Sequence, residues 1–144
     1  EILTGLSESK KKIIWPLHPR TRNRIKEFGY HDLINEDYIK ILNPLGYVEF
    51  VKLLAGCEKV LTDSGGVRRE AYMLGKPVII PITIEWIPEM VDAGWAFISD
   101  ANKEKIVDSL KGFNPKSKRP EIFGDGNAHE KIVKLLVERY SNKR

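Results

Sequence analysis

Residues 58–81 read EKVLTDSGGVRREAYMLGKPVIIP, an order of apolar runs and turn residues that indicates strand, glycine turn, helix and strand. The run at residues 59–62 predicts a strand, residues 67–74 predict a helix that Gly75 closes, and residues 77–80 predict the next strand. A helix that connects two such strands is the usual crossover of a parallel sheet. The stretch therefore predicts an α/β fold.

The turn between the first strand and the helix is Asp63-Ser64-Gly65-Gly66. Two glycines in a row let a ligand approach the backbone closely, because no Cβ atoms stand in its way. The helix that follows presents unpaired N–H groups and the positive end of its dipole at this turn. Ser64 can cap the helix or donate its hydroxyl to a phosphate oxygen. We therefore expect an anion site here, most naturally for phosphate.

Two other interpretations of this turn must be weighed. Asp-Ser-Gly-Gly also surrounds the nucleophile of chymotrypsin-like proteases, but those enzymes are β-barrels, and here the turn lies between an apolar strand and an amphipathic helix. A plain strand–helix turn with a serine cap is the other interpretation, because a Gly-Gly turn alone is weak evidence for a ligand.

Glu70 provides a second signal for a ligand. Val67, Ala71 and Leu74 recur at helical spacing and predict the face that turns toward the sheet, with Glu70 on the flank of this stripe. A carboxylate in that place needs a partner. A ribose diol would supply neutral donors close to the phosphate turn. The alternative is a surface glutamate, or one that pairs with a neighbouring arginine.

Length and composition fit one soluble domain. The chain has 144 residues, 42% of them apolar and 31% charged, which is ordinary for a globular protein with a core of its own. No apolar run approaches the roughly 20 residues of a membrane span, and we expect no membrane contact. The single cysteine, Cys57, excludes a disulfide framework and a cysteine-based zinc site, and it fits a reducing cytoplasm.

The beginning of the chain and its charge give two further expectations. The chain opens at Glu1 without methionine or a signal-peptide pattern, so we interpret it as a piece of a longer protein. The net charge is +4, but the basic clusters at residues 10–12, 116–119 and 142–144 do not alternate with aromatic residues. We therefore expect no nucleic acid partner. A modest positive field would still favour anionic ligands.

Strands and helices alternate along the whole chain. We expect strands at residues 12–17, 39–43, 59–62, 77–80 and 95–98, helices at residues 20–28, 47–57, 67–74, 88–92, 100–110 and 127–140, and an exposed loop at residues 113–126. In the helix at residues 47–57, Val48, Val51, Leu54 and Ala55 should face inward, and Asp100 should cap the helix at residues 100–110. Together these elements predict a parallel sheet with helices on both faces.

Three unusual loops fall at one edge of this predicted sheet. Ligands of such sheets bind beyond the carboxyl ends of the strands. The loops at residues 18–21, 43–47 and 63–66 each follow a predicted strand, so all three should meet at that edge. Their shared edge is stronger evidence for a site than any one loop.

Several of these motifs together resemble one known family. The runs PLGYVEF at residues 44–50, LTDSGGV at residues 61–67, EA at residues 70–71 and LGKPV at residues 74–78 are similar to the non-hydrolysing UDP-N-acetylglucosamine 2-epimerases. His-Pro-Arg-Thr at residues 18–21 and Phe-Gly-Asp-Gly at residues 123–126 also fit. The resemblance extends over nearly the whole chain, and its combined spacing is far more specific than one glycine-rich loop.

The resemblance implies a two-domain, glycosyltransferase-B-like architecture with Rossmann-like halves and a UDP-sugar in the cleft between them. Residues 1–144 would be the C-terminal, UDP-binding domain, and the N-terminal domain would be absent from this chain. The implied partners are a UDP-sugar, the chain's own N-terminal domain and, for the full-length protein, a second copy in a homodimer. No metal or redox cofactor is implied, and the setting would be cytoplasmic polysaccharide biosynthesis.

The implied reaction inverts C2 of UDP-GlcNAc to give UDP-ManNAc, through elimination and re-addition of UDP. The family's acidic catalytic residues belong to the N-terminal domain, so no catalytic residue is assigned here, and this chain alone would be inactive as an isomerase. By motif match, six residues would bind UDP. These are Ser64, Gly65 and Gly66 at the diphosphate, Glu70 at the ribose, and Phe50 and Leu45 beside the uracil.

The chain departs from the family pattern at residues 82–89, ITIEWIPE, which contain neither of the two arginines usual there. Those arginines would neutralise diphosphate charge, and the loss of one charge-assisted pair typically costs about 1.5–3 kcal/mol. Arg68 stands where glutamine is common, although helical geometry is expected to point it away from the sheet face. Two alternatives therefore stay open: the nucleotide-sugar domain of a glycosyltransferase, and a non-catalytic domain that has lost its ligand.

Overall fold

The computed structural model describes residues 1–83 and 88–141, and its strands pair in parallel. In chain order the strands are β1 (Ile13–Pro16), β2 (Ile39–Leu42), β3 (Val60–Leu61), β4 (Val78–Ile80) and β5 (Ala96–Ile98). β1 pairs with β2, and β4 lies between β3 and β5. The predicted parallel α/β class is confirmed, but hydrogen bonding divides the strands into two groups where one sheet was expected. The division follows from the shortness of β3. The N–H groups of Val60, in β3, and of Thr62, directly after it, both donate hydrogen bonds to the β4 side, to the carbonyls of Pro77 and Ile79.

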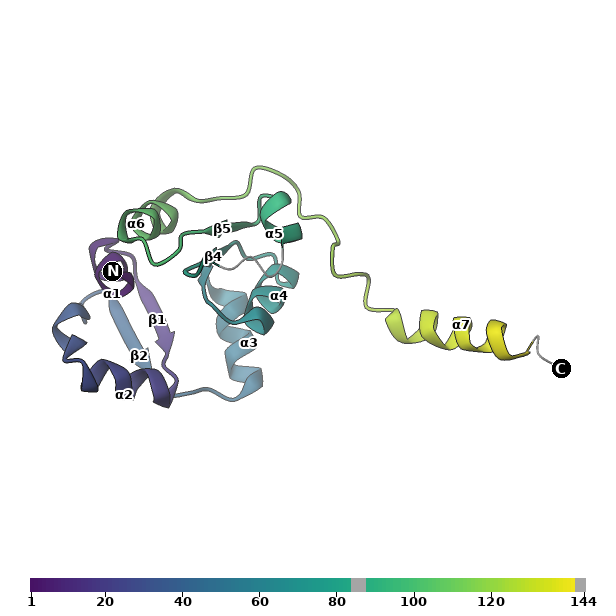
Figure 1. Ribbon diagram of the computed structural model, residues 1–144, viewed down its shortest axis with the longest axis horizontal. Helices are drawn as coiled ribbons and strands as arrows, with labels where there is room; N and C mark the ends of the chain where they lie inside the picture. Colours follow the sequence, from purple (N-terminus) through teal and green to yellow (C-terminus); the bar gives the residue numbers. More distant parts are fainter. Residues whose placement is uncertain (84–87, 142–144) are drawn as a thin grey trace.

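Helices cover the strands on both faces, as predicted (Figure 1). In chain order they are α1 (Ile2–Glu8), α2 (Pro19–Glu27), the 3-10 helix η1 (Tyr30–Leu33), α3 (Tyr47–Gly56), α4 (Gly65–Met73), α5 (Pro88–Asp92), α6 (Lys103–Gly112) and α7 (Ala128–Ser141). Successive side chains of a strand point to opposite faces. Val78 and Ile80 accordingly join the core beneath α3, α4 and α5, whereas Ile79 joins the core beneath α1 and α6.

The core beneath α1 and α6 connects the two groups of strands. Ile79 of β4 clusters there with Ile39 of β2, and Ile106 of α6 is fully buried against them. Ile13 and Leu61, from β1 and β3, pack against the same cluster. The two groups of strands therefore share one hydrophobic core, even though their ladders are separate.

The inward face of α3 differs from the prediction. Val48 is 58% exposed and Ala55 is also exposed, whereas Leu54 is buried and Val51 is half-buried. The residues of α3 and its carboxyl end that pack on the core are Phe50, Leu54 and Cys57, which are spaced i, i+4 and i+7. The helix is therefore rotated from the predicted orientation, and the aromatic ring of Phe50 is directed to the core.

The predicted cap of α6 is also wrong. The helix begins at Lys103, and the side chain of Asn102 accepts a hydrogen bond from the N–H of Lys105 at 2.8 Å. Asp100 instead has a left-handed backbone, with φ of 51°, in the turn that follows β5. Both residue types favour helix caps, and the length of this turn places Asn102 at the start of the helix.

The segment at residues 113–126 was predicted as an exposed loop, but its middle is anchored on α4. The hydroxyl of Tyr72 donates to the carbonyl of Pro120 at 2.6 Å. The ring of Phe123 meets the Tyr72 ring edge to face with centroids 5.3 Å apart, and the Arg119 guanidinium lies over the Tyr72 ring at 5.3 Å. We call residues 114–127 the strap.

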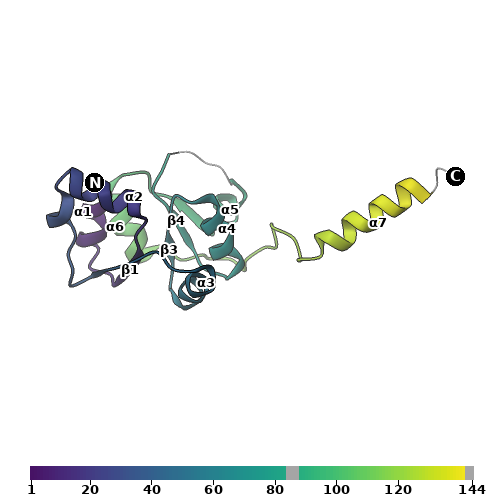
Figure 2. The ribbon, with the colours of Figure 1, turned by 90° about the horizontal axis from the view of Figure 1, so that it is seen from below.

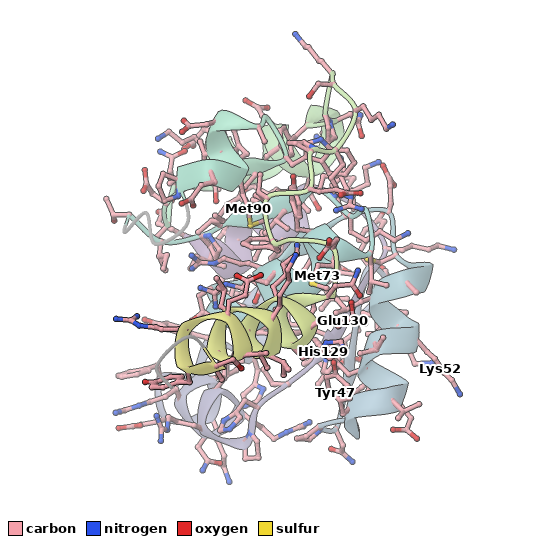
Figure 3. The ribbon with its side chains drawn as sticks, turned by 90° about the vertical axis from the view of Figure 1, so that its right-hand side faces the viewer. Tyr47, Lys52, Met73, Met90, His129 and Glu130 are labelled. Atoms are coloured by element: carbon pink, nitrogen blue, oxygen red, sulfur yellow. The ribbon has the colours of Figure 1, made fainter. Side chains whose placement is uncertain are left out.

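Beyond the strap, α7 extends away from the body of the molecule (Figures 1 and 2). Figure 3, viewed from the end at which α7 extends, shows this helix in front of the body and Lys52 of α3 projecting outward. The large apolar side chains of α7 are 51% to 64% exposed, namely Ile132, Val133, Leu135, Leu136, Val137 and Tyr140. An apolar face of this size on one helix indicates an interaction surface.

Replacement of Tyr72 by phenylalanine tests the anchoring of the strap. The change removes the hydrogen bond to Pro120 and keeps the ring, so we expect the free energy of unfolding to fall by about 1 kcal/mol. Urea unfolding measures this loss. The same change at Tyr47, which is 69% exposed, is the control and should stay within about 0.5 kcal/mol of wild type. Equal stability of all three proteins would contradict the anchoring.

Candidate functional site

The amino terminus of α4, directly after β3, forms the candidate site. Ser64 caps this helix, because its Oγ accepts a hydrogen bond from the N–H of Val67 at 3.5 Å and its carbonyl accepts one from the N–H of Arg68 at 3.0 Å. The N–H of Ser64 donates to Thr62 Oγ1 at 3.1 Å, which fixes the turn. The helix begins at Gly65, two residues before the predicted start, so both glycines belong to its first turn.

The two glycines leave an open surface with free donors. Within residues 1–83 and 88–141, no hydrogen bond is made by the N–H of Gly65 or of Gly66. A Cβ atom added at Gly65 would meet nothing within 4 Å, and one at Gly66 would meet only Ser64 Oγ at 4.0 Å. Neither glycine has a left-handed backbone, so the fold does not require glycine here. The free donors and open space fit the close approach of an anion.

Glu70 lies on the same helix and has no partner. Its side chain is half-buried, and in the described part of the chain it forms no hydrogen bond or ion pair, not even with the neighbouring Arg68 and Arg69. The alternative of a glutamate paired with an arginine is therefore not what the structure shows. A carboxylate without a partner can accept the two hydroxyls of a ribose, and this role stays a prediction.

The two residues predicted beside the uracil lie on α3 or in the loop before it. Phe50 is half-buried and packs on the core cluster that also includes Val67 of α4. Leu45 lies in the loop and is 36% exposed. Because α3 and α4 pack against each other, Phe50 lies near the helix that carries the open turn, and Leu45 precedes α3 by two residues. Their contact with a base remains a prediction.

The predicted orientation of Arg68 is wrong. Its side chain is only 1% exposed, and Nη2 donates to the carbonyl of Asp63 at 2.7 Å. Side chains of a helix lean toward its amino terminus, so Arg68 reaches back beneath the first turn of α4. Burial lowers the pKa of the guanidinium, and the Asp63 carboxylate partly offsets this effect. Arg68 shares its face with Ala71 and Tyr72, at i+3 and i+4, and that spacing is the sequence signal for its burial.

The other two predicted loops follow β1 and β2. His18 caps α2, with Nδ1 accepting from the N–H of Arg20 at 3.2 Å. Arg22 connects α2 to the loop after β2, because Nη2 donates to Asn43 Oδ1 at 3.3 Å. These contacts hold the two loops together at the carboxyl ends of β1 and β2. Of the segment at residues 82–89, residues 84–87 lie outside the described residues.

The described residues contain neither a candidate metal cluster nor a helix suited to span a membrane. Within residues 1–83 and 88–141 there is no group of three or more histidine, cysteine, aspartate or glutamate side chains that could hold a metal ion. None of the helices described there combines the length and apolar character needed to cross a membrane.

The chain is similar to known proteins over the segments that contain these motifs. Residues 1–137 match the family model described as UDP-N-acetylglucosamine 2-epimerase. The chain is 41% identical over 138 residues to a UDP-N-acetylglucosamine 2-epimerase homolog of Methanococcus maripaludis, with 94% of this chain and 38% of that protein covered.

Two solved structures of the UDP-GlcNAc 2-epimerase from Methanocaldococcus jannaschii share the fold. The first matches with a TM-score of 0.85 at 38% identity, covering 95% of this chain and 40% of that one. The second, in complex with UDP-GlcNAc and UDP, matches with a TM-score of 0.84 at the same identity and coverage.

The chain thus spans about 40% of the length of the relatives that it matches. The match nevertheless extends over nearly all of this chain and includes the turn, the helix and the strands described above. The resemblance noted in the sequence is confirmed, and the chain belongs to the UDP-N-acetylglucosamine 2-epimerase family.

Proposed function

We propose that this chain is the C-terminal, UDP-binding domain of a UDP-GlcNAc 2-epimerase with a two-domain, glycosyltransferase-B-like architecture. The observation that carries the proposal is the open amino terminus of α4. In the described part of the chain the N–H groups of Gly65 and Gly66 make no hydrogen bond, and a Cβ added at either glycine would meet nothing closer than 4.0 Å. A helix amino terminus with free donors favours phosphate groups. A relative with the same fold has been solved with UDP-GlcNAc and UDP, which supports a UDP-sugar as the ligand.

The proposed orientation of UDP uses all six predicted contacts. The diphosphate accepts hydrogen bonds from Gly65, Gly66 and the Ser64 hydroxyl, whose proton is available because its oxygen only accepts from the N–H of Val67 at 3.5 Å. The ribose then lies further along α4, where the Glu70 carboxylate accepts hydrogen bonds from its hydroxyls. The uracil extends toward α3, between Leu45 and the exposed part of Phe50.

In this function the domain binds the leaving group of the reaction. Epimerisation at C2 through elimination breaks the bond between C1 and the diphosphate oxygen, and negative charge develops on UDP. Fixed N–H groups at a helix amino terminus stabilise such charge without reorganisation. We assign proton transfer at C2 to the N-terminal domain, so this chain contributes binding and charge stabilisation but no catalytic residue. A metal or redox cofactor has no part in this scheme, and the cytoplasm remains the proposed location.

The apolar face of α7 supports a second domain as its partner. Within residues 1–83 and 88–141, the strap is anchored at Tyr72, and α7 then leaves the body with its large apolar side chains exposed. The chain accounts for only about 40% of the length of its relatives. We therefore assign the α7 face to contact with the remaining domain of the same protein, with a homodimer as the other occupant to be tested.

Calorimetric titration of this chain with UDP, UMP and uridine tests the diphosphate site. Wild type should bind UDP saturably and uridine much more weakly. Gly65→Ala should weaken UDP binding by about tenfold or more, equivalent to roughly 1.4 kcal/mol, because the new Cβ blocks the approach of the phosphate. Its unfolding free energy should not fall, because alanine suits a helix better than glycine.

Gly56→Ala is the matched control for that titration, because a Cβ at Gly56 also meets nothing within 4 Å and Gly56 lies at the far end of α3. It should bind UDP as wild type does. UDP binding by Gly65→Ala that equals wild type would exclude the α4 turn as the diphosphate site.

Product analysis of the longer protein that contains this chain tests the reaction. We expect interconversion of UDP-GlcNAc and UDP-ManNAc, with Glu70→Ala weakening substrate binding and leaving the products unchanged. Transfer of the sugar to an acceptor, without formation of the epimer, would instead establish the glycosyltransferase alternative.

Replacement of Leu136 by glutamate tests the assignment of α7. Leu136 is already 51% exposed in this chain, so the unfolding free energy of the chain should change by less than about 0.5 kcal/mol. In the longer protein the same change should cost about 1.5–3 kcal/mol, because an apolar contact is lost.

Lys134→Glu, on the polar face of α7, is the control and should be tolerated in both proteins. Sedimentation of this chain tests whether a second copy of the chain, rather than the remaining domain, covers the α7 face. A dimer that Leu136→Glu dissociates would show that a second copy, and not the N-terminal domain, covers the face.

A further inference from the structure

Arg68 is a buried cation whose donors are mostly unused. Three buried side-chain polar atoms in the described part of the chain lack a hydrogen-bond partner, and two of them are Nε and Nη1 of Arg68. The side chain is 1% exposed, and no salt bridge involves it within residues 1–83 and 88–141. A guanidinium remains charged at any ordinary pH. Among the residues that the structure describes, this positive charge is therefore compensated only in part.

The hydrogen bond that Arg68 does make fixes where this charge lies. Nη2 is 2.7 Å from the carbonyl oxygen of Asp63, the residue directly before the Ser64 cap. The guanidinium thus lies beneath the turn whose upper side carries the free N–H groups of Gly65 and Gly66. The Asp63 carboxylate is the charged group that interacts with it electrostatically, and that carboxylate is exposed.

A purely structural role explains little of this arrangement. A bond to the Asp63 carbonyl needs one donor, and a neutral side chain would supply it. The other buried donors lose their hydration without gaining partners, which destabilises the fold. In return, a charge in the protein interior acts over several ångströms with little screening by solvent or salt. The arrangement is therefore unfavourable in the free protein and becomes favourable when an anion binds above the turn.

We propose that Arg68 is a buried positioning residue that supplies the counter-charge for the diphosphate bound at the amino terminus of α4. It acts through the field that it adds to the helix dipole at Gly65 and Gly66, and it needs no direct contact with the ligand. The proposal rests on the proposed function and assigns to that site a source of charge within this chain. Residues 82–89 contain no arginine that could share this task.

Arg68→Gln and Arg69→Gln are the matched pair that tests this role. Both remove one positive charge from α4, but Arg69 is exposed, so solvent screens its charge. We expect Arg68→Gln to weaken UDP binding by about 10- to 100-fold, the range of one buried charge-assisted interaction. Uridine binding should be unchanged, and the ligand-free melting temperature should be equal or higher. Arg69→Gln should change UDP binding by less than about threefold.

Dependence on salt gives a readout that a structural role would not move. UDP binding by wild type should weaken as the salt concentration rises, because the ligand is anionic. Arg68→Gln should bind UDP more weakly but with most of the same salt dependence, because the interaction that it loses is buried. Arg69→Gln should instead lose part of its salt dependence. A lower melting temperature of Arg68→Gln together with weaker uridine binding would identify Arg68 as structural and overturn the proposal.

Stabilisation by inorganic pyrophosphate, measured as the rise in melting temperature, tests the role of Arg68 separately from the identity of UDP as the ligand. If Arg68→Gln binds UDP as tightly as wild type, the counter-charge is wrong and the UDP site stands. In a second outcome, wild type binds no UDP, while pyrophosphate raises the melting temperature of wild type but not that of Arg68→Gln. That result would support the role of Arg68 as a counter-charge and would exclude UDP as the ligand. If neither UDP nor pyrophosphate affects wild type, both are overturned.

Discussion

The amino terminus of α4 is held in place by the burial of one face of that helix. Ala71 and Tyr72 are fully buried, and they fix the helix over β4 while its first turn extends past the end of β3. Gly75, with φ of 71°, ends the helix and allows Lys76 to donate back to the Ala71 carbonyl at 2.8 Å. The helix is thus fixed at both ends, which also fixes the direction of the N–H groups of Gly65 and Gly66. The strap adds to this constraint through its contacts with Tyr72.

The same helix contains a buried charge with unpartnered donors. Arg68 is buried on the face that packs inward, and two of its nitrogen atoms have no partner among the described residues. Buried polar groups are usually satisfied, and exceptions often mark functional sites. If the domain binds a diphosphate, as proposed, a positive charge that its own carboxylates do not neutralise would attract that ligand. In this account some stability of the free chain is given up for affinity toward the ligand.

Much of the fold could be predicted from sequence, because periodicity and turn residues agree with each other. The strand–helix order, the glycine stop at Gly75 and the motif-based family are confirmed. The errors arise where tertiary packing decides. The rotation of α3 depends on the contact of Phe50 with the core, and the separation of the two strand groups depends on the shortness of β3. The burial of Arg68 was missed because helical geometry was expected to point it away from the sheet face, although its spacing to Ala71 and Tyr72 indicated otherwise. The roles of Ser64, Glu70, Phe50 and Leu45 toward a ligand stay predictions.

The most direct measurement of the central claim is an NMR titration of the backbone amides of this chain with UDP. The account predicts that the amide signals of Gly65 and Gly66 shift saturably with UDP, because these N–H groups gain a phosphate acceptor, and that uridine moves them far less. Signals of Gly65 and Gly66 that stay unmoved while amides elsewhere shift would contradict the account, because UDP would then bind away from the amino terminus of α4.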